Sequence, residues 1–469
     1  MPDRYHIHVV PTPGRFQRIG KYGTADWRED CSRCKNCVKH RCLYDVYRNE
    51  GTHNRTPDTP QEPVFECKAC MSCVQGCTKG LLSMALNPGF LALGDAYWKP
   101  DIIASTWVQS DAGRIPVSGA GYRGRFSGPG FDSMWTDMSE IVRPTRDGIH
   151  GREYISTAVD IGSKPLRLNF DEKGELTNPS SLIEIQIPAI LDAAPWGDPS
   201  EALVKARVTA AEHLHTLAVV PETHLAAIPP AQRRFILPLL DCEDALENTD
   251  LLSGMRMIEL NDGASIIETA EKLREFNKDV LIAVRVIARH DALKRVLDLH
   301  EAGISVIHLS ADHHGREVGE NGKTRFIRDV LREIHGNLVQ RGVRDEVTLI
   351  ASGGIALAEH MPKALICGAD LVGVDIPLLI SIGCRVCKNG HHTVCPIGLS
   401  QADVSYAAQR MVNLMGAWHS QLIEVLGAMG IREVRRLRGE TGRAMFVEDL
   451  ERDAFKDLAR ATPEEVKAG

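Results

Sequence analysis

The sequence predicts an α/β protein, a closed (β/α)8 barrel that follows a smaller, cysteine-rich α+β module. From residue 181 onward, short apolar segments alternate with amphipathic ones, which is typical of parallel strands joined by helices. Eight of the 13 cysteines lie between Cys31 and Cys77. The 469 residues, 43% of them hydrophobic and 25% charged, are enough to bury a large core in two or three domains.

The charge balance argues against a nucleic-acid or membrane partner. Lys and Arg number 55 against 62 Asp and Glu, which gives a net charge of -7 with no long basic run. No segment reaches the ~18 consecutive apolar residues of a spanning helix, and the start MPDRYHIHVVPTPGRFQ lacks an apolar signal core. We therefore expect a cytoplasmic protein whose partners are a small molecule and another protein subunit.

Composition divides the chain into four regions. Residues 1–80 hold the cysteine module, and 81–180 form a Gly-, Pro- and Asp-rich connector with short strands and no sustained helical period. Residues 181–400 form the barrel, and 401–469 form a helical extension. In that extension a stripe at helical spacing is expected to face the core, and its members are Met411, Leu414, Trp418, Leu422 and Leu426.

Eight apolar segments are predicted as barrel strands, and eight is the number that closes this kind of barrel. They are residues 182–187, 217–220, 234–239, 256–260, 280–286, 305–309, 347–350 and 371–374. Helices lie between them. One is 325–340, whose Phe326, Val330, Ile334 and Leu338 recur near the 3.6-residue period and would face the sheet.

The cysteine module repeats one spacing. DCSRCKNCVKHRC reads C-x2-C-x2-C-x4-C, and ECKACMSCVQGC reads C-x2-C-x2-C-x3-C. Three thiolates with two residues between each pair bind one face of an iron–sulfur cubane. The fourth ligand must then come from farther away in the sequence. The module resembles the bacterial two-cluster ferredoxin. That resemblance implies two crossed [4Fe-4S] centres, one held by Cys31, Cys34, Cys37 and Cys77 and the other by Cys67, Cys70, Cys73 and Cys42.

Zinc is the alternative metal at these cysteines, but it prefers two C-x2-C pairs in a tetrahedral site of four thiolates. The proline that follows the fourth cysteine in ferredoxins is absent here, and Leu43 and Thr78 stand in its place. The ligands remain, while the hydrogen bonds that set the cluster potential differ.

A long motif near the end of the predicted barrel carries a second resemblance. The stretch VTLIASGGIALAEHMPKALICGADLVGVDIPLLISIGCRVCKNGHHTVCPIGLS is similar to the FMN-binding synthase domain of the glutamate synthase family, and the likeness extends over about residues 180–440. It implies a TIM-type barrel with FMN at its C-terminal mouth. The phosphate is expected against Ser352, Gly353, Gly354, Gly373 and Val374, where bare backbone follows two successive strands. Asp375 departs from the glycine of the family, and its carboxylate would repel a phosphate.

A second group of cysteines follows the last predicted strand. Cys384, Cys387 and Cys395 resemble the three cluster ligands of the family, which implies a [3Fe-4S] centre beside the flavin. The middle cysteine is displaced, and the spacing becomes C-x2-C-x7-C. His391 or His392 offers a fourth ligand, so a [4Fe-4S] centre or a zinc site stays open.

The same resemblance places catalytic residues at two strand ends. Glu222, in VVPETHL, corresponds to the acidic residue of the family, and Arg285, in IAVRVI, to its substrate lysine. An arginine suits a carboxylate but does not readily lose a proton, so Arg285 would orient a 2-oxo acid. His308, His313 and His314 follow the sixth strand and as a set would protonate a substrate of the reduced flavin.

These features predict an enzyme, an iron–sulfur flavoprotein oxidoreductase. Electrons would pass from the N-terminal clusters through the barrel cluster to FMN, for reductive amination of 2-oxoglutarate. The chain opens on Met1-Pro2-Asp3 without the glutaminase domain of the long family members, so a partner subunit is expected to supply ammonia or an amine. The alternative is an electron-transfer subunit of a larger redox complex, without its own amination activity. A zinc-binding interaction protein is a third interpretation.

Overall fold

The computed structural model describes residues 5–16, 18–26, 34, 38–44, 67–115, 129–136, 154–164, 169–175, 182–196, 200–252, 254–319, 324–387 and 397–455. The chain forms two compact units. One consists of Met1–Pro13, Val108–Cys384 and Gly390–Gly469, and the other of Gly14–Trp107 and Arg385–Asn389. None of the helices in the described ranges is long and apolar enough to cross a membrane.

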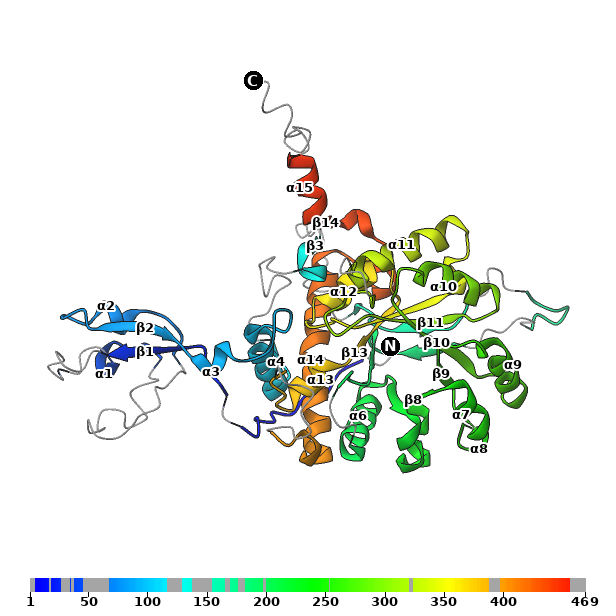
Figure 1. The fold of residues 1–469 in the computed structure, drawn as a ribbon, viewed down its shortest axis with the longest axis horizontal. Helices are drawn as coiled ribbons and strands as arrows, with labels where there is room; N and C mark the ends of the chain where they lie inside the picture. Colours follow the sequence, from blue (N-terminus) through cyan, green and yellow to red (C-terminus); the bar gives the residue numbers. More distant parts are fainter. Residues whose placement is uncertain are drawn as a thin grey trace, which may run out of the picture. The chain divides into compact units, whose positions relative to one another are not determined.

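Eight parallel strands of the larger unit close into a barrel. The labelled strands of this barrel can be followed in Figure 1. In order around the ring they are β6 (Ala189–Leu191), β7 (Ala218–Pro221), β8 (Ile236–Leu240), β9 (Met257–Asn261), β10 (Leu281–Ile287), β11 (Val306–Ser310), β12 (Thr348–Ser352) and β13 (Leu371–Val374). β13 pairs with β6 and closes the ring. The predicted (β/α)8 barrel of the TIM type is therefore confirmed.

The prediction for the first barrel strand is wrong. Residues 182–187 contain β5 (Ile183–Ile185), which pairs antiparallel with β4 (Val159–Ile161) outside the barrel. The barrel strand is β6, which follows Pro188. β5 alternates buried and exposed residues, which is typical of a strand with one face in solvent. All three residues of β6 are buried, as expected for a parallel strand in a barrel. Each of the other seven predicted segments overlaps an observed barrel strand.

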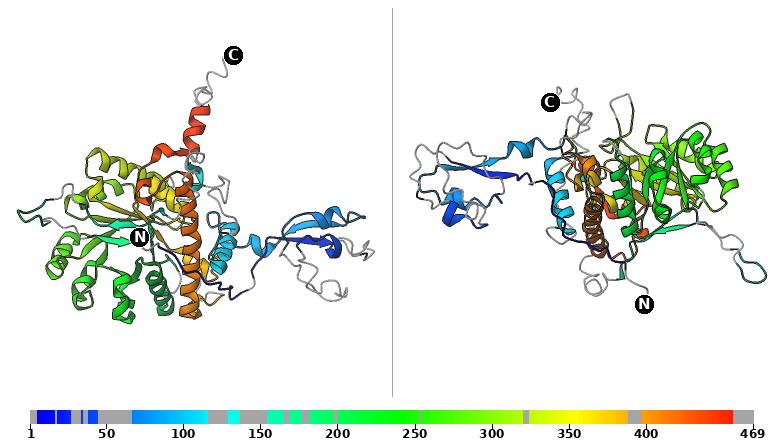
Figure 2. Two further views of the ribbon diagram at one scale, coloured as in Figure 1. Left: turned by 180° about the vertical axis from the view of Figure 1, so that it is seen from behind. Right: turned by 90° about the horizontal axis from the view of Figure 1, so that it is seen from below.

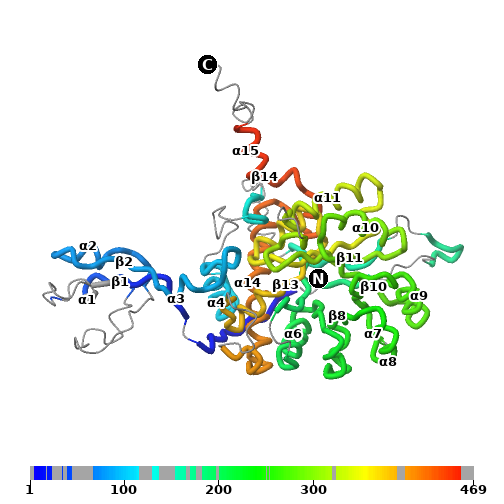
Figure 3. Tube along the Cα trace, in the orientation of Figure 1, coloured from blue at the N-terminus to red at the C-terminus, as the bar shows by residue number. Residues whose placement is uncertain are grey.

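Helices surround the strands, as the two further views in Figure 2 and the trace in Figure 3 show. They are α6 (Glu201–Leu214), α7 (Cys242–Glu247), α8 (Thr249–Leu252), α9 (Ile266–Phe276), α10 (Ala292–Glu301), α11 (Ile327–Gln340), α12 (His360–Ile366) and α13 (Ile376–Ser381). α11 buries Val330, Ile334 and Leu338, as the sequence pattern predicts. Phe326 lies just outside that helix, at its N-cap.

The long helix α14 (Val404–Ala428) packs along α6 and belongs to the core of the barrel unit. It begins at Asp403, whose Oδ1 accepts a hydrogen bond of 2.8 Å from Tyr406 N. The five residues of the predicted stripe are at most 2% exposed, so the prediction that they face the core is confirmed. The buried Arg410 donates from Nη1 to Asp111 Oδ1 and to Thr12 O, and thereby ties α14 to the N-terminal arm.

The connector contains a helix that the sequence pattern did not predict. α4 spans Pro100–Ala112, where we expected no sustained helical period. Its buried residues include Ile102 and Ile103 but also Thr106, Gln109 and Ser110. Because polar residues share the buried surface, the apolar period that would reveal the helix is hidden. Farther along, β3 (Met134–Thr136) pairs with β14 (Ala444–Phe446), which precedes α15 (Val447–Phe455).

The smaller unit contains the N-terminal cysteines. β1 (Tyr22–Asp26) and β2 (Leu82–Leu86) form an antiparallel pair, and α1 (Val38–Arg41), α2 (Ser72–Gln75) and α3 (Pro88–Leu91) complete the described elements. The two strands flank the two cysteine repeats in sequence. Their pairing, together with a hydrogen bond of 3.1 Å from Cys67 N to Tyr22 O, brings the second repeat back to the start of the unit.

Candidate active site

A cluster of charged side chains occupies the interior of the barrel. It consists of Asp192 at the end of β6, Glu259 on β9, Arg285 on β10 and His308 on β11. The side chains of Glu259 and His308 are 0% exposed, that of Asp192 is 2% exposed and that of Arg285 is 13% exposed. Buried charges are costly unless they are paired, so the contacts within this cluster decide what it can bind.

Arg285 pairs with both carboxylates of the cluster. Its Nε donates to Glu259 Oε1 at 3.1 Å, and its Nη2 donates to Glu259 Oε2 at 3.0 Å and to Asp192 Oδ1 at 2.7 Å. Burial opposes the charge, but Asp192 and Glu259 raise the pKa of Arg285 above its usual value. Glu259 occupies the two-pronged edge of the guanidinium, and only Nη1 donates to no described residue.

His308 is held by the same glutamate. Its Nδ1 lies 2.6 Å from Glu259 Oε1. Burial opposes ionisation of Glu259, yet Arg285 and His308 lower the pKa of that carboxyl group to about 2. Because Glu259 is ionised and accepts, His308 Nδ1 carries a proton and donates to it. His308 Nε2 is buried without a hydrogen-bond partner among the described residues, and the carboxylate oxygen Oδ2 of Asp192 lies 3.7 Å away.

Gly373 on β13 opens space beside these two atoms. A Cβ at this position would stand 2.8 Å from Ser352 Cβ, 3.1 Å from Asp192 Oδ2 and 3.3 Å from His308 Nε2. Any side chain here would therefore press into the interior cluster. Close packing inside the barrel therefore favours glycine at this position. Contact with a phosphate, which the sequence predicts here, would favour the same residue.

Gly354 is required by backbone packing. Its φ is +70°, and a Cβ would lie 2.6 Å from Gly315 Cα, in the loop that follows β11. The neighbouring Gly353 packs in the same way against Ala311 and Asp312. Next to them Ser352 is 2% exposed, and no described residue forms a hydrogen bond with its Oγ. Ser352 is therefore the side chain of the predicted phosphate site that remains available to a ligand.

Asp375 begins α13 and caps it. Its Oδ1 accepts a hydrogen bond of 2.6 Å from Ile376 N, and the residue is 5% exposed. Burial and the neighbouring Asp192 carboxylate raise the pKa of Asp375 to about 7. The strand ends that carry the two aspartates are adjacent, since Asp192 N donates to Val374 O at 2.8 Å. The repulsion expected between Asp375 and a phosphate is thus reduced, because the group is partly protonated at neutral pH.

Glu222 lies apart from the cluster in its described contacts. It begins a 3-10 turn, Glu222–Ala227, directly after β7, and its Oε1 accepts a hydrogen bond of 3.0 Å from Asn248 Nδ2. Because Glu222 directly follows β7, it lies at the C-terminal end of that strand, the end at which barrels of this kind bind their ligands. The sequence did not point to Asp192 or Glu259, although a carboxylate within each apolar strand segment, AILD and MIELN, is a usable signal.

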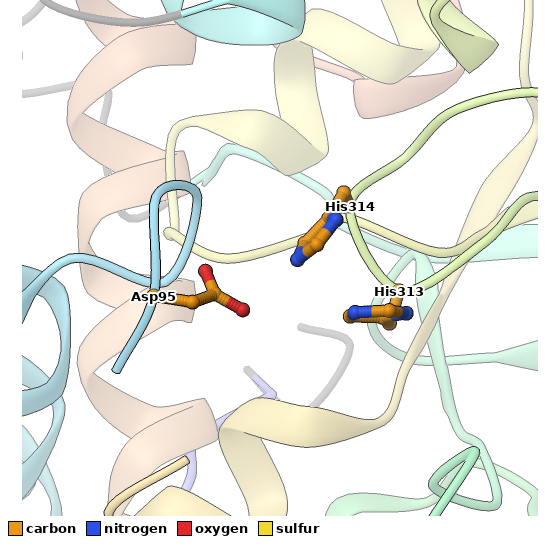
Figure 4. Close-up of side chains that lie close together, drawn as sticks. All are labelled: Asp95, His313 and His314. Atoms are coloured by element: carbon orange, nitrogen blue, oxygen red, sulfur yellow. The ribbon is translucent and has the colours of Figure 1, made fainter. Parts of the chain in front are cut away.

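His313 and His314 lie together in the turn after β11, with ring centroids 3.8 Å apart (Figure 4). The ring of Trp196 meets that of His313 edge-on at 4.9 Å. The predicted set of three histidines is therefore divided: His308 points into the barrel among carboxylates, while the other two pack on each other in a loop.

Another histidine, on α12, fixes the segment that follows Gly354. His360 Nε2 lies 2.9 Å from Asp132 Oδ1, and its Nδ1 accepts from Ala356 N at 3.1 Å. Asp132, Glu359 and His360 are close enough to share a metal ion, but both ring nitrogens of His360 already have protein partners. We assign this group a structural role.

The described cysteines are thiols without disulfides. In the N-terminal unit Cys42 and Cys73 are buried, Cys67 and Cys77 are half-buried, and Cys34 and Cys70 are exposed. Cys384 is buried in the barrel unit, after α13, and Cys387 is exposed in the other unit. Cys31, Cys37 and Cys395, together with His391 and His392, lie outside the described residues.

The backbone beside two of these cysteines is unusual. Ala69 precedes Cys70 with φ +58°, and Val386 precedes Cys387 with φ +48°. A left-handed backbone is costly for residues with a Cβ, and most costly for a β-branched one. Backbone amides also reach sulfur, with Leu81 N donating to Cys77 Sγ at 3.4 Å, and such bonds lower the pKa of that thiol. Strain and N–H···S bonds of this kind suit thiolate ligands.

Residues 242–432 match the family model described as the conserved region in glutamate synthase. The match begins at α7 and ends after α14, so it includes the barrel strands from β9 to β13. The whole chain is similar to the archaeal glutamate synthase [NADPH] of Archaeoglobus fulgidus, with 23% identity over 96% of this chain and 98% of that protein. It is also 23% identical to the archaeal-type glutamate synthase [NADPH] of Dehalococcoides mccartyi, over 87% of this chain and 92% of the relative.

A solved structure similar to this chain is the flavin-binding domain of baker's yeast flavocytochrome b2. The identity is 16%, the TM-score is 0.41, and the match covers 70% of this chain and 86% of that domain. The matched region contains Glu259, Arg285 and His308, and also Ser352 and Gly373 of the predicted phosphate contacts. Asp192 and Glu222 precede the matched region. The interior cluster therefore combines three residues of that region with Asp192, which directly follows the first barrel strand.

Proposed function

We propose that this chain is an FMN-dependent iron–sulfur oxidoreductase of the glutamate synthase type, which reduces the 2-imino acid formed from a 2-oxo acid and ammonia or an amine. The observation that carries the proposal is the match of residues 242–432 to the conserved region in glutamate synthase, because this region contributes most of the barrel and its interior cluster. The archaeal relatives named glutamate synthase [NADPH] support the same reaction.

The residues at the barrel mouth suit FMN. Ser352 Oγ is without a described partner, and the left-handed turn at Gly353 and Gly354 resembles the backbone concavities that bind anions. Asp375, partly protonated near neutral pH, would tolerate a phosphate better than an ionised carboxylate. These residues, with Gly373 and Val374, would hold the phosphate. When bound, FMN would supply the hydride chemistry that amino-acid side chains lack.

Arg285 would contact the substrate through one nitrogen. Since Glu259 and Asp192 occupy Nε and Nη2, the free Nη1 is the atom that would bind a carboxylate oxygen of a 2-oxo acid. This is a single-pronged contact, weaker and less directional than a bidentate one. Glu222, ordered by Asn248, would act as the acid or base at the mouth.

The cysteines would carry electrons to the flavin. Cys31, Cys34, Cys37 and Cys77 would hold one [4Fe-4S] centre, Cys67, Cys70, Cys73 and Cys42 a second, and Cys384, Cys387 and Cys395 a [3Fe-4S] or [4Fe-4S] centre. The left-handed backbone at Ala69 and Val386 supports ligand roles for the cysteines that follow them. A partner subunit would supply the ammonia or amine.

The ion pairs of Arg285 favour a second candidate function. A guanidinium whose two-pronged edge is occupied by Glu259 is less available to a substrate than the lysine of the family. An FMN and iron–sulfur subunit that only converts between one- and two-electron carriers, inside a larger redox complex, needs no such contact. Turnover of a 2-oxo acid separates the two candidates.

Anaerobic spectroscopy of the full chain tests the proposal. We expect flavin absorption, FMN on acid release, about 11 iron atoms per chain, and electron paramagnetic resonance signals from the clusters. Reduced protein given 2-oxoglutarate and an ammonium salt should form glutamate. Zinc without visible absorption would contradict both functions, and reducible FMN without turnover would leave the electron-transfer function.

A further inference from the structure

A buried histidine holds the turn in which the sequence predicts the phosphate site. His360, on α12, is 2% exposed. Its Nδ1 lies 3.1 Å from Ala356 N and 3.3 Å from Gly354 O. The turn is left-handed at its start, where Gly353 and Gly354 have φ values of +91° and +70°. One ring nitrogen therefore contacts two backbone groups of this turn.

The imidazole is fixed on its other side by the 3-10 turn η2 (Gly130–Ser133). Asp132 Oδ1 lies 2.9 Å from His360 Nε2, and the ring of Phe131 packs on the imidazole with ring centroids 5.5 Å apart. Lys363 Nζ, also on α12, donates to Phe131 O at 2.8 Å and so holds η2 against the helix. An element far away in sequence therefore sets where the imidazole lies.

The contact with the turn exists in both charge states of the imidazole. Nε2 carries a proton that the Asp132 carboxylate accepts. Nδ1 of the neutral ring then accepts from Ala356 N, whereas Nδ1 of the charged ring donates to Gly354 O. On its other side the turn packs against the loop after β11, through Gly353 and Gly354. The turn is therefore held between that loop and His360.

We infer that His360 is a positioning residue for the phosphate group of the flavin, and that Asp132 acts through it. A backbone turn binds an anion well when its N–H groups already point inward, because ordering the turn on binding lowers the affinity. The contacts of His360 supply this order before the flavin binds. The identity of the ligand rests on the proposed function, and the inference concerns the phosphate group alone.

The ratio of the dissociation constants of riboflavin and FMN isolates the phosphate, because riboflavin lacks that group. Flavin fluorescence gives both constants with the full-length protein after release of its flavin. We expect His360→Gln to lower the ratio about tenfold or more, because its amide lies farther along the side chain, near Asp132 rather than the turn. His360→Asn should retain the ratio, since its amide takes the place of Nδ1 toward Ala356 and Gly354.

Asp132 offers a second pair of variants, which serves if the histidine variants do not fold. Asp132→Asn keeps an oxygen acceptor for Nε2 and should keep the ratio, whereas Asp132→Ala should lower it. His300→Gln is the matched control. His300 Nε2 also contacts a carboxylate, Glu346 Oε2 at 3.0 Å, but this pair precedes β12 instead of following it. Its loss should leave the ratio unchanged.

An unchanged ratio in His360→Gln and Asp132→Ala would overturn the inference, as would equal losses of FMN and riboflavin affinity. A preference for FMN that depends on His360, in a protein that does not turn over a 2-oxo acid, would support the inference and contradict the proposed reaction. Glutamate formation by a protein that binds FMN no more tightly than riboflavin would contradict this inference alone. A protein that binds neither flavin would contradict both.

Discussion

Glu259 Oε1 lies 2.6 Å from His308 Nδ1 in the interior of the barrel, and both side chains are fully buried. The same carboxylate accepts from Nε and Nη2 of Arg285. One side chain therefore orients both an imidazole and a guanidinium, each from a different strand. Glu259 is a positioning residue for the candidate site.

Glu259→Gln should destabilise the protein strongly. The change leaves the guanidinium of Arg285 and the imidazole of His308 without their shared anion, and breaking a buried ion pair costs about 3–5 kcal/mol. Urea unfolding checks the value. Glu268→Gln is the control, because Glu268 is an exposed residue paired with Lys272 one helical turn away, and its loss should leave the midpoint nearly unchanged. Similar midpoints for both variants would show that the cluster is dispensable.

Asp375 should make stability depend on pH. Its pKa is raised from 3.8 to about 7, so the folded state holds this proton more tightly than the unfolded state. The contribution is complete below pH 3.8 and is lost as the pH rises through 7, with a total of the order of 4 kcal/mol. Glu259 acts in the opposite sense, since its pKa is lowered to about 2 and its contribution is lost only in acid.

Unfolding of Asp375→Asn and of the natural sequence, followed from about pH 5 to 8, isolates this effect. Relative to the variant, the natural protein should lose stability across that range. Asparagine also caps helices, so the start of α13 should survive the change. Parallel stability curves for the two proteins would mean that Asp375 is ionised throughout.

Ser352→Ala separates phosphate binding from packing. Ser352 Oγ has no described hydrogen-bond partner, so its loss should change stability little and release FMN more readily. Gly354→Val should instead disturb both properties, because φ is +70° and the new Cβ would strike Gly315. The readouts are the unfolding midpoint and the flavin retained on gel filtration. Undiminished FMN in Ser352→Ala would place the phosphate elsewhere.

Cys384→Ser should affect the barrel cluster alone. Cys384 follows α13 in the barrel unit, whereas the described N-terminal cysteines belong to the other unit. We expect loss of the [3Fe-4S]-type resonance and disturbance of flavin reduction, while both ferredoxin-type signals remain. Simultaneous loss of all cluster signals would argue against separate modules.

The barrel could be predicted because most of its strands are short, continuously apolar runs with helices between them. The first barrel strand could not be predicted, because the sequence of β5 is more typical of a strand than the sequence of β6. The segment IEIQI alternates and is β-branched, whereas AIL is only three residues long and follows Pro188. The decisive criterion is burial on both faces, which AIL satisfies and IEIQI does not.

The site could be predicted in part. Sequence reasoning located Arg285 and the strand-end segment Ser352–Gly354, but it could not foresee that Arg285 is already paired. That pairing depends on Asp192 and Glu259, which come from strands far apart in sequence and meet only when the barrel closes. Gly354 looked like a phosphate contact, yet a glycine needed for backbone packing has the same appearance in a sequence.

We propose that the barrel uses bound FMN to reduce the product of a 2-oxo acid and ammonia. A single-turnover experiment tests it most directly: the anaerobically reduced full-length protein is mixed with 2-oxoglutarate and an ammonium salt, and the flavin absorption is followed. We predict reoxidation of the flavin and the clusters only when both compounds are present, with one glutamate formed for every two electrons that the protein loses. Flavin that stays reduced, or a protein that contains no FMN, would contradict it.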